Sequence, residues 1–342
     1  MKNELAKIIV DLYRKDCEVD IDIQDVSFLF FSSRMSDILF VFIKGNKQPK
    51  YVLKVSQDEI KIEHIKKEWD ILTGISRFNA GILHKTFPLP LYSGVVNGHY
   101  LFVEEACKGI PLVNFMYSKR NKRKEICNVL RSTTEWISEL HRVSFLENVS
   151  IDNFLSAGWV MKIIESFGSL HNLTDQENQF IRELMQLNNL KVPLVTQHSD
   201  FSPYNMFCDK TGKALFVLDW QYSVLRGSPL VDLLNFLVFS QSLLSNPGRS
   251  ARKRINLKSF FANIYNILPD QDDFINTFYG NGWFSRFASD CIKEYCNKIS
   301  LDRGVLRLIF ILFIFRHLYN KKDFFATFVG KGDPVFIKAM NT

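Results

Sequence analysis

Three short runs of large apolar residues near the N-terminus constrain the fold of this chain most strongly. Residues 26–31 (VSFLFF), 38–43 (ILFVFI) and 51–55 (YVLKV) are rich in Val, Ile, Leu and Phe, and polar or Gly- and Pro-bearing connectors separate them. Runs of this length and composition predict strands, and their close spacing predicts an antiparallel meander. The first part of the chain is therefore expected to form a small antiparallel sheet.

One helix is expected to interrupt these strands. Residues 58–75 place apolar side chains at intervals of three and four, at Ile62, Ile65, Trp69 and Leu72. This spacing puts them on one face of a helix. Two further strand-like segments follow at 91–96 and 100–104, and residues 1–20 have the charge pattern of an amphipathic first helix. The sheet is thus predicted to carry a helix inserted after its third strand.

The pattern changes from strands to helices near residue 112. Gly109 and Pro111 break the chain within the segment EEACKGIPL, residues 104–112. Beyond it, helical spacing predominates at 122–142, 154–168, 174–188, 229–244, 256–267 and 301–320. A chain of 342 residues, 46% of them hydrophobic, suits one large domain or two lobes with a sizeable core. The break favours an N-terminal sheet lobe followed by a mostly helical lobe.

Residues 195–223 concentrate four polar side chains of chemical interest. His198, Asp200 and Asn205 lie within eight residues of one another, and Asp219 follows the apolar run ALFVL. Any turn is rich in Asp, Asn, Ser and Pro, so the cluster alone is only suggestive. Phosphoryl transfer, however, needs a carboxylate to aim a hydroxyl and oxygen ligands for Mg²⁺, and this set supplies both.

Three segments of the chain resemble the aminoglycoside phosphotransferase and choline kinase superfamily. HSDFSPYNMF (198–207) is similar to its catalytic loop, and FVLDWQYSVLRGSPLVDLLNF (216–236) is similar to its metal-binding segment. ISELHRV (137–143) resembles the end of the helix that precedes them. The resemblance covers roughly residues 25–240.

This resemblance implies an α+β, two-lobed, protein-kinase-like fold. Residues 1–104 would form the N-terminal nucleotide-binding lobe, and residues 105–111 would form the hinge. Residues 112–342 would form a helical C-terminal lobe with the catalytic loop and the acceptor site.

The resemblance also implies distinct roles for the residues of the motif. Asp200 would orient the acceptor hydroxyl and take its proton, which makes it the catalytic residue. Asn205 and Asp219 would be the metal ligands. His198 is expected to brace the loop through hydrogen bonds, and Asp232 to anchor it, although an Asp at a helix start also stabilises the first turn.

Lys54 is the predicted cation of the nucleotide site. It lies on the third strand, where a lone Lys more often faces solvent unless it has a partner. Glu68, on the following helix, is the expected partner by position, and the resemblance implies Glu68 rather than Glu59 or Glu63 because its neighbours Trp69 and Leu72 match the family's pattern. A pair of this kind would hold the ammonium against the α- and β-phosphates.

Two other parts of the nucleotide site carry a weaker signal. Ser33 and Ser36, in the glycine-free segment 32–37 (SSRMSD), would contact the phosphates, or the segment is an ordinary polar hairpin. Backbone groups of Glu104 and Ala106 would contact the base, or the segment is a plain linker.

The expected activity is transfer of the γ-phosphate of ATP or GTP, with Mg²⁺, to a hydroxyl of a small molecule. A protein kinase is disfavoured because only a dozen residues separate Asp219 from Asp232, which leaves no room for an activation segment. The alternative is a weak or inactive pseudokinase that serves as a nucleotide-binding or interaction scaffold.

The acceptor stays open at the level of sequence. Acidic and aromatic residues after residue 269 would suit an amino-sugar, choline or ethanolamine, whereas the basic residues at 249–254 would suit an acidic or phosphorylated sugar. The net charge of +7 is spread along the chain, so no nucleic-acid partner is expected. The longest apolar run is too short to span a bilayer, and the charged N-terminus is unlike a signal peptide, so we expect a cytoplasmic protein. The oligomeric state is not indicated.

Overall fold

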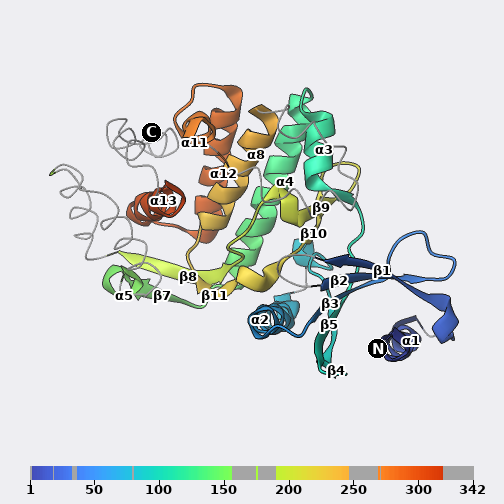
Figure 1. The fold of residues 1–342 in the computed structure, drawn as a ribbon. Coiled ribbons are helices and arrows are strands. Elements are labelled where there is room, and N and C mark those ends of the chain that lie inside the picture. The colour runs from blue at the N-terminus through green and yellow to red at the C-terminus, as the bar shows by residue number, and fades with distance from the viewer. Residues whose placement is uncertain are drawn as a thin grey trace.

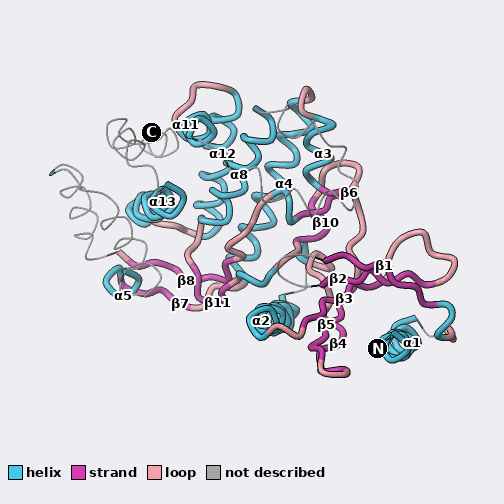
Figure 2. The backbone as a smooth tube through the Cα atoms, in the orientation of Figure 1, coloured by secondary structure: helices cyan, strands magenta, loops and turns pink. Residues whose placement is uncertain are grey.

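The N-terminal region is built on the expected antiparallel sheet. The structure is a computed structural model that describes residues 2–17, 19–32, 37–78, 81–155, 175, 190–245, 269 and 271–318. Its first sheet contains β1 (Val26–Ser32), β2 (Asp37–Ile43), β3 (Tyr51–Ser56), β4 (Pro90–Val96) and β5 (His99–Glu105). They pair in the order β1-β2-β3-β5-β4, and every pair is antiparallel (Figures 1 and 2). The predicted strands are thus confirmed to within one or two residues at each end.

The two faces of this sheet are covered by different helices. Side chains alternate between faces along a strand, so Leu53 and Lys54 of β3 point in opposite directions. Leu53 packs in a cluster with Ile9 of α1 (Lys2–Cys17). The opposite face, which carries Lys54, meets α2 (Glu59–Ile75) through a buried ion pair. The Asp58 side chain begins α2 by accepting the Lys61 N–H at 3.0 Å.

The second region is mostly helical, as predicted. Its described helices are α3 (Leu112–Lys119), α4 (Arg123–Val143), α5 (Ile151–Leu155), α8 (Val231–Ser245), α11 (Gln271–Phe278), α12 (Trp283–Ile299) and α13 (Arg303–Leu318). The helices predicted at 122–142, 229–244 and 301–320 correspond to α4, α8 and α13. The predictions at 154–168, 174–188 and 256–267 lie almost entirely outside the described residues.

Helices α3, α11 and α12 were not predicted. Helix α12 buries Phe284, Ala288, Cys291, Ile292 and Tyr295. These positions have helical spacing, but Ala and Cys give only a weak apolar signal, and polar residues separate them. Helix α12 lies beside α4 in the helical region (Figure 1).

Two small sheets carry the polar motif. In one, β9 (Met206–Cys208) lies between β10 (Ala214–Val217) and β6 (Ile110–Pro111). In the other, β8 (Lys191–Gln197) lies between β11 (Val224–Gly227) and β7 (Glu147–Ser150). The α+β architecture expected from the sequence is therefore confirmed: a five-stranded antiparallel sheet with one inserted helix, followed by a helical region. Among the described helices, none is long and apolar enough to cross a membrane.

Candidate active site

Lys54 and Glu68 form a buried ion pair between the sheet and α2. The distance from Lys54 Nζ to Glu68 Oε1 is 2.6 Å, and the two side chains are 12% and 2% exposed. Glu59 and Glu63, the other acidic candidates on α2, are exposed. The structure therefore brings together the pair that the strand and helix positions indicated.

The same carboxylate links α2 to the segment after Asp219. Glu68 Oε1 also accepts the backbone N–H of Trp220 at 3.2 Å. Trp220 begins the short 3₁₀ helix η5 (Trp220–Tyr222), which packs against α2. One carboxylate oxygen thus holds both the strand Lys and the residue next to the predicted metal ligand.

Glu104 contributes a side chain that the sequence analysis did not anticipate. Its Oε1 lies 3.5 Å from Lys54 Nζ, and the residue is only 5% exposed. Its Oε2 is buried and has no hydrogen-bond partner within the described part of the chain. The pairing of β3 with β5 sets Lys54 opposite Phe102, and Glu104 is two residues further along the same face. Strand alternation was the signal that would have found it.

The backbone positions proposed for the base are partly engaged within the protein. The Ala106 N–H donates to the Lys50 carbonyl oxygen at 3.0 Å. Glu104 lies within β5, where its backbone is opposite Val52 of β3 and Pro90 of β4. Contact of these two backbones with a base stays a prediction. Ser33 and Ser36, the predicted phosphate contacts, lie outside the described residues.

The charge balance around Lys54 is strongly negative. Burial by itself would lower the pKa of Lys54, but the carboxylates of Glu104, Glu68 and Asp219 raise it above its ordinary value. Burial raises the pKa of Glu104 to about 7, with Lys54 opposing and Glu68 reinforcing the shift. Burial, reinforced by Glu68, also raises the pKa of Asp219 to about 7. Three carboxyl groups therefore lie within electrostatic reach of one ammonium group. Glu104 and Asp219 hold protons more readily than ordinary carboxyl groups, and a bound cation would favour their ionised forms.

We expect the substitution Glu104→Gln to stabilise the fold at neutral and higher pH. Because its pKa is raised on folding, Glu104 binds a proton in the folded state that the unfolded state releases, and stability falls as pH rises from about 5 to about 7. Gln has no titrating group and removes this loss. The melting temperature of the variant minus that of the wild type should therefore increase as pH rises from about 5 to about 7, and should stay constant at higher pH. Glu105→Gln, at the half-buried next position, is the matched control and should show no such trend. A flat difference for Glu104→Gln would contradict the assignment.

The loop after β8 places Asp200 beside Asn205. Asn205 Nδ2 donates to both the Oδ2 and the backbone oxygen of Asp200, each at 2.9 Å. The Leu218 N–H donates to the Asn205 carbonyl oxygen at 2.8 Å, which brings the end of β10 onto the loop. Asp200 also contributes to the raised pKa of Asp219, so the two carboxylates are within electrostatic reach of each other. Asp200, Asn205 and Asp219 therefore converge in space.

His198 holds this loop from inside. It is fully buried, its Nε2 lies 2.8 Å from the Leu218 carbonyl oxygen, and its Nδ1 accepts the Asp200 N–H at 3.3 Å. Nε2 must carry the proton in this arrangement, because it faces a carbonyl oxygen. The geometry is that of a brace between the two halves of the motif.

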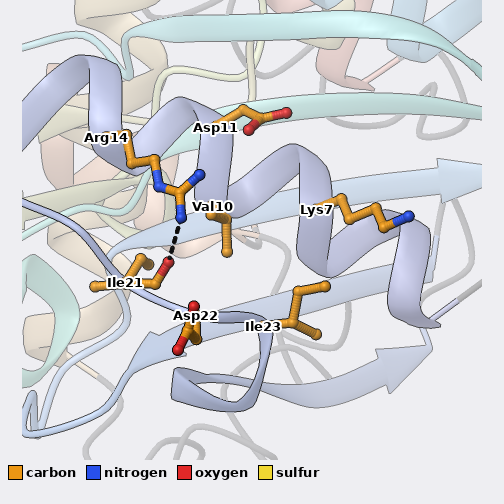
Figure 3. A pocket seen from close by; sticks show the side chains of 7 residues that line it. All are labelled: Lys7, Val10, Asp11, Arg14, Ile21, Asp22 and Ile23. Atoms are coloured by element: carbon orange, nitrogen blue, oxygen red, sulfur yellow. Dashed lines mark hydrogen bonds between the residues drawn. The ribbon is translucent and has the colours of Figure 1, made fainter.

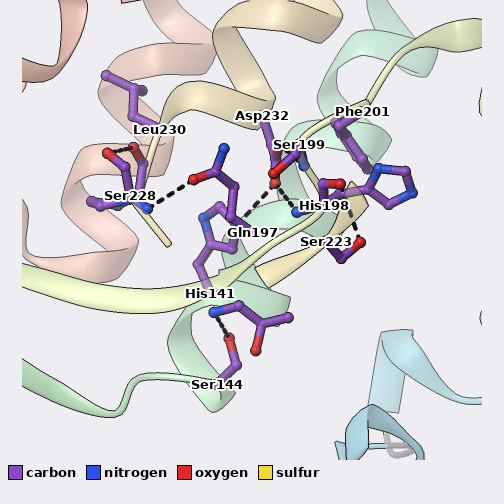
Figure 4. A network of polar contacts seen from close by, with 12 residues as sticks. His141, Ser144, Gln197, His198, Ser199, Phe201, Ser223, Ser228, Leu230 and Asp232 are labelled. Carbon is purple, nitrogen blue, oxygen red and sulfur yellow. Dashed lines mark hydrogen bonds and ion pairs between the residues drawn. The ribbon is translucent and has the colours of Figure 1, made fainter. Parts of the chain in front are cut away.

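The side chain of Asp232 anchors the loop by binding backbone groups of the loop. Its carboxylate accepts the N–H groups of His198 at 2.7 Å and Ser199 at 2.9 Å (Figure 4). It is also the second residue of α8, a position where an Asp can stabilise the first turn, so the two predictions for this residue are compatible. Ser199 and Asp219 have positive φ angles of 69° and 63°, which non-glycine residues adopt only when their surroundings impose them.

The donor set fits Mg²⁺. Mg²⁺ prefers oxygen ligands and usually takes one or two carboxylates together with phosphate and water. Asn205 and Asp219 offer an amide oxygen and a carboxylate, and the burial of Asp219 favours a cation beside it. Within the described ranges, no group of three or more His, Cys, Asp or Glu side chains forms a ready-made metal site.

A separate hollow of about 260 Å³ lies on the far face of the sheet. Figure 3 shows it between α1 and the segment around Ile21, Asp22 and Ile23. The Arg14 guanidinium at its wall already donates to the Ile21 carbonyl oxygen and pairs with Asp20. Since Lys54 points to the opposite face, this hollow is not part of the polar cluster.

The region expected to select the acceptor is only partly described. Residues 249–254 and Asp270 lie outside the described residues. Glu294 of α12, one of the acidic candidates, lies 4.0 Å from Arg131 of α4. Its charge is thus balanced at least partly within the helical region.

Comparison with known proteins gives structural similarity without a sequence match. No protein-family model and no curated protein matches the chain. Aminoglycoside phosphotransferase APH(3'')-Id from Streptomyces rimosus ATCC10970 is 11% identical with a TM-score of 0.47, covering 92% of this chain and 98% of that one. A thermostable mutant of aminoglycoside phosphotransferase APH(4)-Ia, in complex with ADP and hygromycin B, is 14% identical with a TM-score of 0.48, covering 95% and 98%.

Proposed function

We propose that this protein is a phosphotransferase that moves the γ-phosphate of ATP or GTP to a hydroxyl group of a small molecule. The observation that carries the proposal is the convergence of two elements: the buried Lys54–Glu68 pair and the loop that joins Asp200, Asn205 and Asp219. Phosphoryl transfer depends on positioning and on neutralising phosphate charge, and these groups supply both.

Each side chain has a separate task in this proposal. Asp200 orients the acceptor hydroxyl and accepts its proton, while the Asn205 amide fixes the direction of the Asp200 carboxylate. Lys54, held by Glu68, contacts the nucleotide phosphates. Asn205 and Asp219 would hold Mg²⁺, which when bound neutralises phosphate charge. The lobes at 1–104 and 112–342, joined at 105–111, and a cytoplasmic location belong to the same proposal.

The acceptor class is the least constrained part of the proposal. Amino-sugars such as aminoglycosides, simple sugars, choline and ethanolamine all carry the primary or secondary hydroxyl that this chemistry requires.

The decisive test is a screen for acceptor-dependent release of ADP or GDP. Purified protein with Mg²⁺ and either nucleotide is incubated with a panel of amino-sugars, simple sugars, choline, ethanolamine and nucleosides. The Asp200→Ala protein is run beside it to subtract background hydrolysis. We expect one acceptor class to give turnover that Asp200→Ala lacks. Absence of Mg²⁺-dependent nucleotide binding by equilibrium titration would contradict the proposal directly.

A further inference from the structure

The hydroxyl of Tyr295 lies at a junction of three elements of the helical region. Tyr295 is on α12, is fully buried, and accepts the N–H of Leu230 at 2.7 Å. Its oxygen also lies 2.5 Å from Nδ1 of His141 on α4. Burial raises the pKa of Tyr295 well above its ordinary value, so the hydroxyl keeps its proton. Since the oxygen already accepts from Leu230, that proton is directed to His141 Nδ1.

This contact determines which nitrogen of His141 carries hydrogen. If Nδ1 accepts from Tyr295, Nε2 must bear the proton of the neutral ring. Nε2 lies 3.6 Å from Oδ2 of Asp232, and both side chains are buried. The opposite tautomer would aim a lone pair at a carboxylate, which is unfavourable in a buried site. Tyr295 thereby turns the His141 N–H toward the Asp232 carboxylate, an electrostatic contact at 3.6 Å that is longer than a hydrogen bond.

The second contact of Tyr295 fixes the start of α8. Leu230 has a φ angle of 68°, a left-handed conformation that a Leu adopts only when other contacts hold it. Its carbonyl oxygen accepts the Leu234 N–H in the first turn of α8. Because Tyr295 binds the Leu230 N–H, it holds the turn from which Asp232 projects.

The contacts of Tyr295 with His141 and with Leu230 both affect the position of Asp232, and Asp232 in turn binds the backbone of the catalytic loop. Figure 4 shows His141, Leu230, Asp232, His198 and Ser199 gathered in one polar network. Asp232 accepts the two N–H groups immediately before Asp200. The orientation of the backbone that carries Asp200 therefore depends on a group far away in the sequence.

We propose that the Tyr295 hydroxyl is a positioning group for the catalytic loop, acting through His141 and the start of α8 on Asp232. This inference rests on the proposed role of Asp200 as the base. It extends the machinery to α12, a helix beyond the segment, residues 25–240, in which the resemblance was found. Tyr295 touches no reacting atom in this proposal and is not a catalytic residue.

The test uses Tyr295→Phe, which removes the hydroxyl and keeps the ring. Amide hydrogen exchange, followed on peptides that span residues 194–201, should become faster because the hydrogen bonds from His198 and Ser199 to Asp232 weaken. With an active acceptor, kcat should fall by about 10- to 100-fold, while the nucleotide dissociation constant stays within about threefold.

Two control variants separate this role from general destabilisation. Ser285→Ala removes another buried hydroxyl of α12, one without a hydrogen-bond partner within the described residues. Ile292→Val weakens the packing of the same helix without touching the polar network. Neither should change exchange at residues 194–201 selectively.

The possible results are distinguishable. Selective faster exchange in Tyr295→Phe supports the inference even if no acceptor is ever phosphorylated, in which case only the proposed function fails. Exchange in Tyr295→Phe equal to the wild type, or matched by Ile292→Val, overturns the inference. A fall in kcat with an equal weakening of nucleotide binding overturns it as well, because positioning of the loop predicts a selective effect on kcat.

Discussion

Replacing Asp200 by Asn is expected to lower kcat by about 10³-fold, within the range that a positioned general base contributes. The amide has the shape of the carboxylate, and its oxygen can still accept the Asn205 Nδ2–H that now holds Oδ2. The loop should therefore keep its conformation while it loses the group that takes the proton. Nucleotide affinity should stay within about threefold of the wild type, because Lys54 and Glu68 are unchanged.

The measurements for this prediction are steady-state turnover with the best acceptor and equilibrium titration with the nucleotide. Asp152→Asn, which removes the same charge from an exposed position on α5, is the matched control and should leave both unchanged. A pseudokinase scaffold predicts a different outcome, namely nucleotide binding without turnover in the wild type and no measurable effect of Asp200→Asn. Equal turnover of Asp200→Asn and an active wild type would show that Asp200 is not the base.

The local patterns of the sequence predicted the elements that hold the site. Short runs of apolar, strand-favouring residues predicted the five strands of the first sheet, and the spacing of Ile62, Ile65, Trp69 and Leu72 predicted α2. Lys54 and Glu68 were matched by their positions on adjacent elements, and the ion pair joins them. Such contacts are predictable because the two elements follow each other directly in the chain.

The side chain of Glu104 could not be assigned in the same way. Its direction depends on the register of β5 against β3, and a shift of one residue would turn it to the face that α1 covers. From the sequence, only a backbone role was predicted for this residue. The register places a third carboxyl group near Lys54 and changes the charge of the whole cluster.

The contact between His141 and Tyr295 could not be predicted from any local pattern of the sequence. The two residues are 154 positions apart, and α12 was not predicted as a helix. Long-range contacts between helices depend on packing angles and on small side chains at the crossing, which periodicity does not report. The sequence thus indicated the loop that carries Asp200 but not the helix that carries Tyr295.

Replacing Lys54 by Met is expected to destabilise the fold by about 3–5 kcal/mol at neutral pH, the usual effect of removing one partner of a buried ion pair. Glu68 and Glu104 would lose their shared cation while staying buried. Burial raises the pKa of Glu104 and Lys54 opposes this shift, so without Lys54 the stability of the variant should fall further than that of the wild type as pH rises from about 5 through about 7. Urea unfolding followed by far-ultraviolet circular dichroism at several pH values measures this effect without any assumption about activity.

Two further variants identify the cause of the loss. Lys67→Met, on the exposed face of α2, is the matched control and should change stability by less than about 0.5 kcal/mol. The double variant Lys54→Met, Glu68→Gln should recover much of the loss, because the amide oxygen still accepts the Trp220 N–H and carries no charge. If Lys54→Met were as stable as Lys67→Met at pH 8, the buried carboxyl groups would not depend on Lys54. The electrostatic basis of the proposed nucleotide site would then be wrong. Recovery in the double variant would show that the loss in Lys54→Met comes from leaving the Glu68 carboxylate buried without its cation.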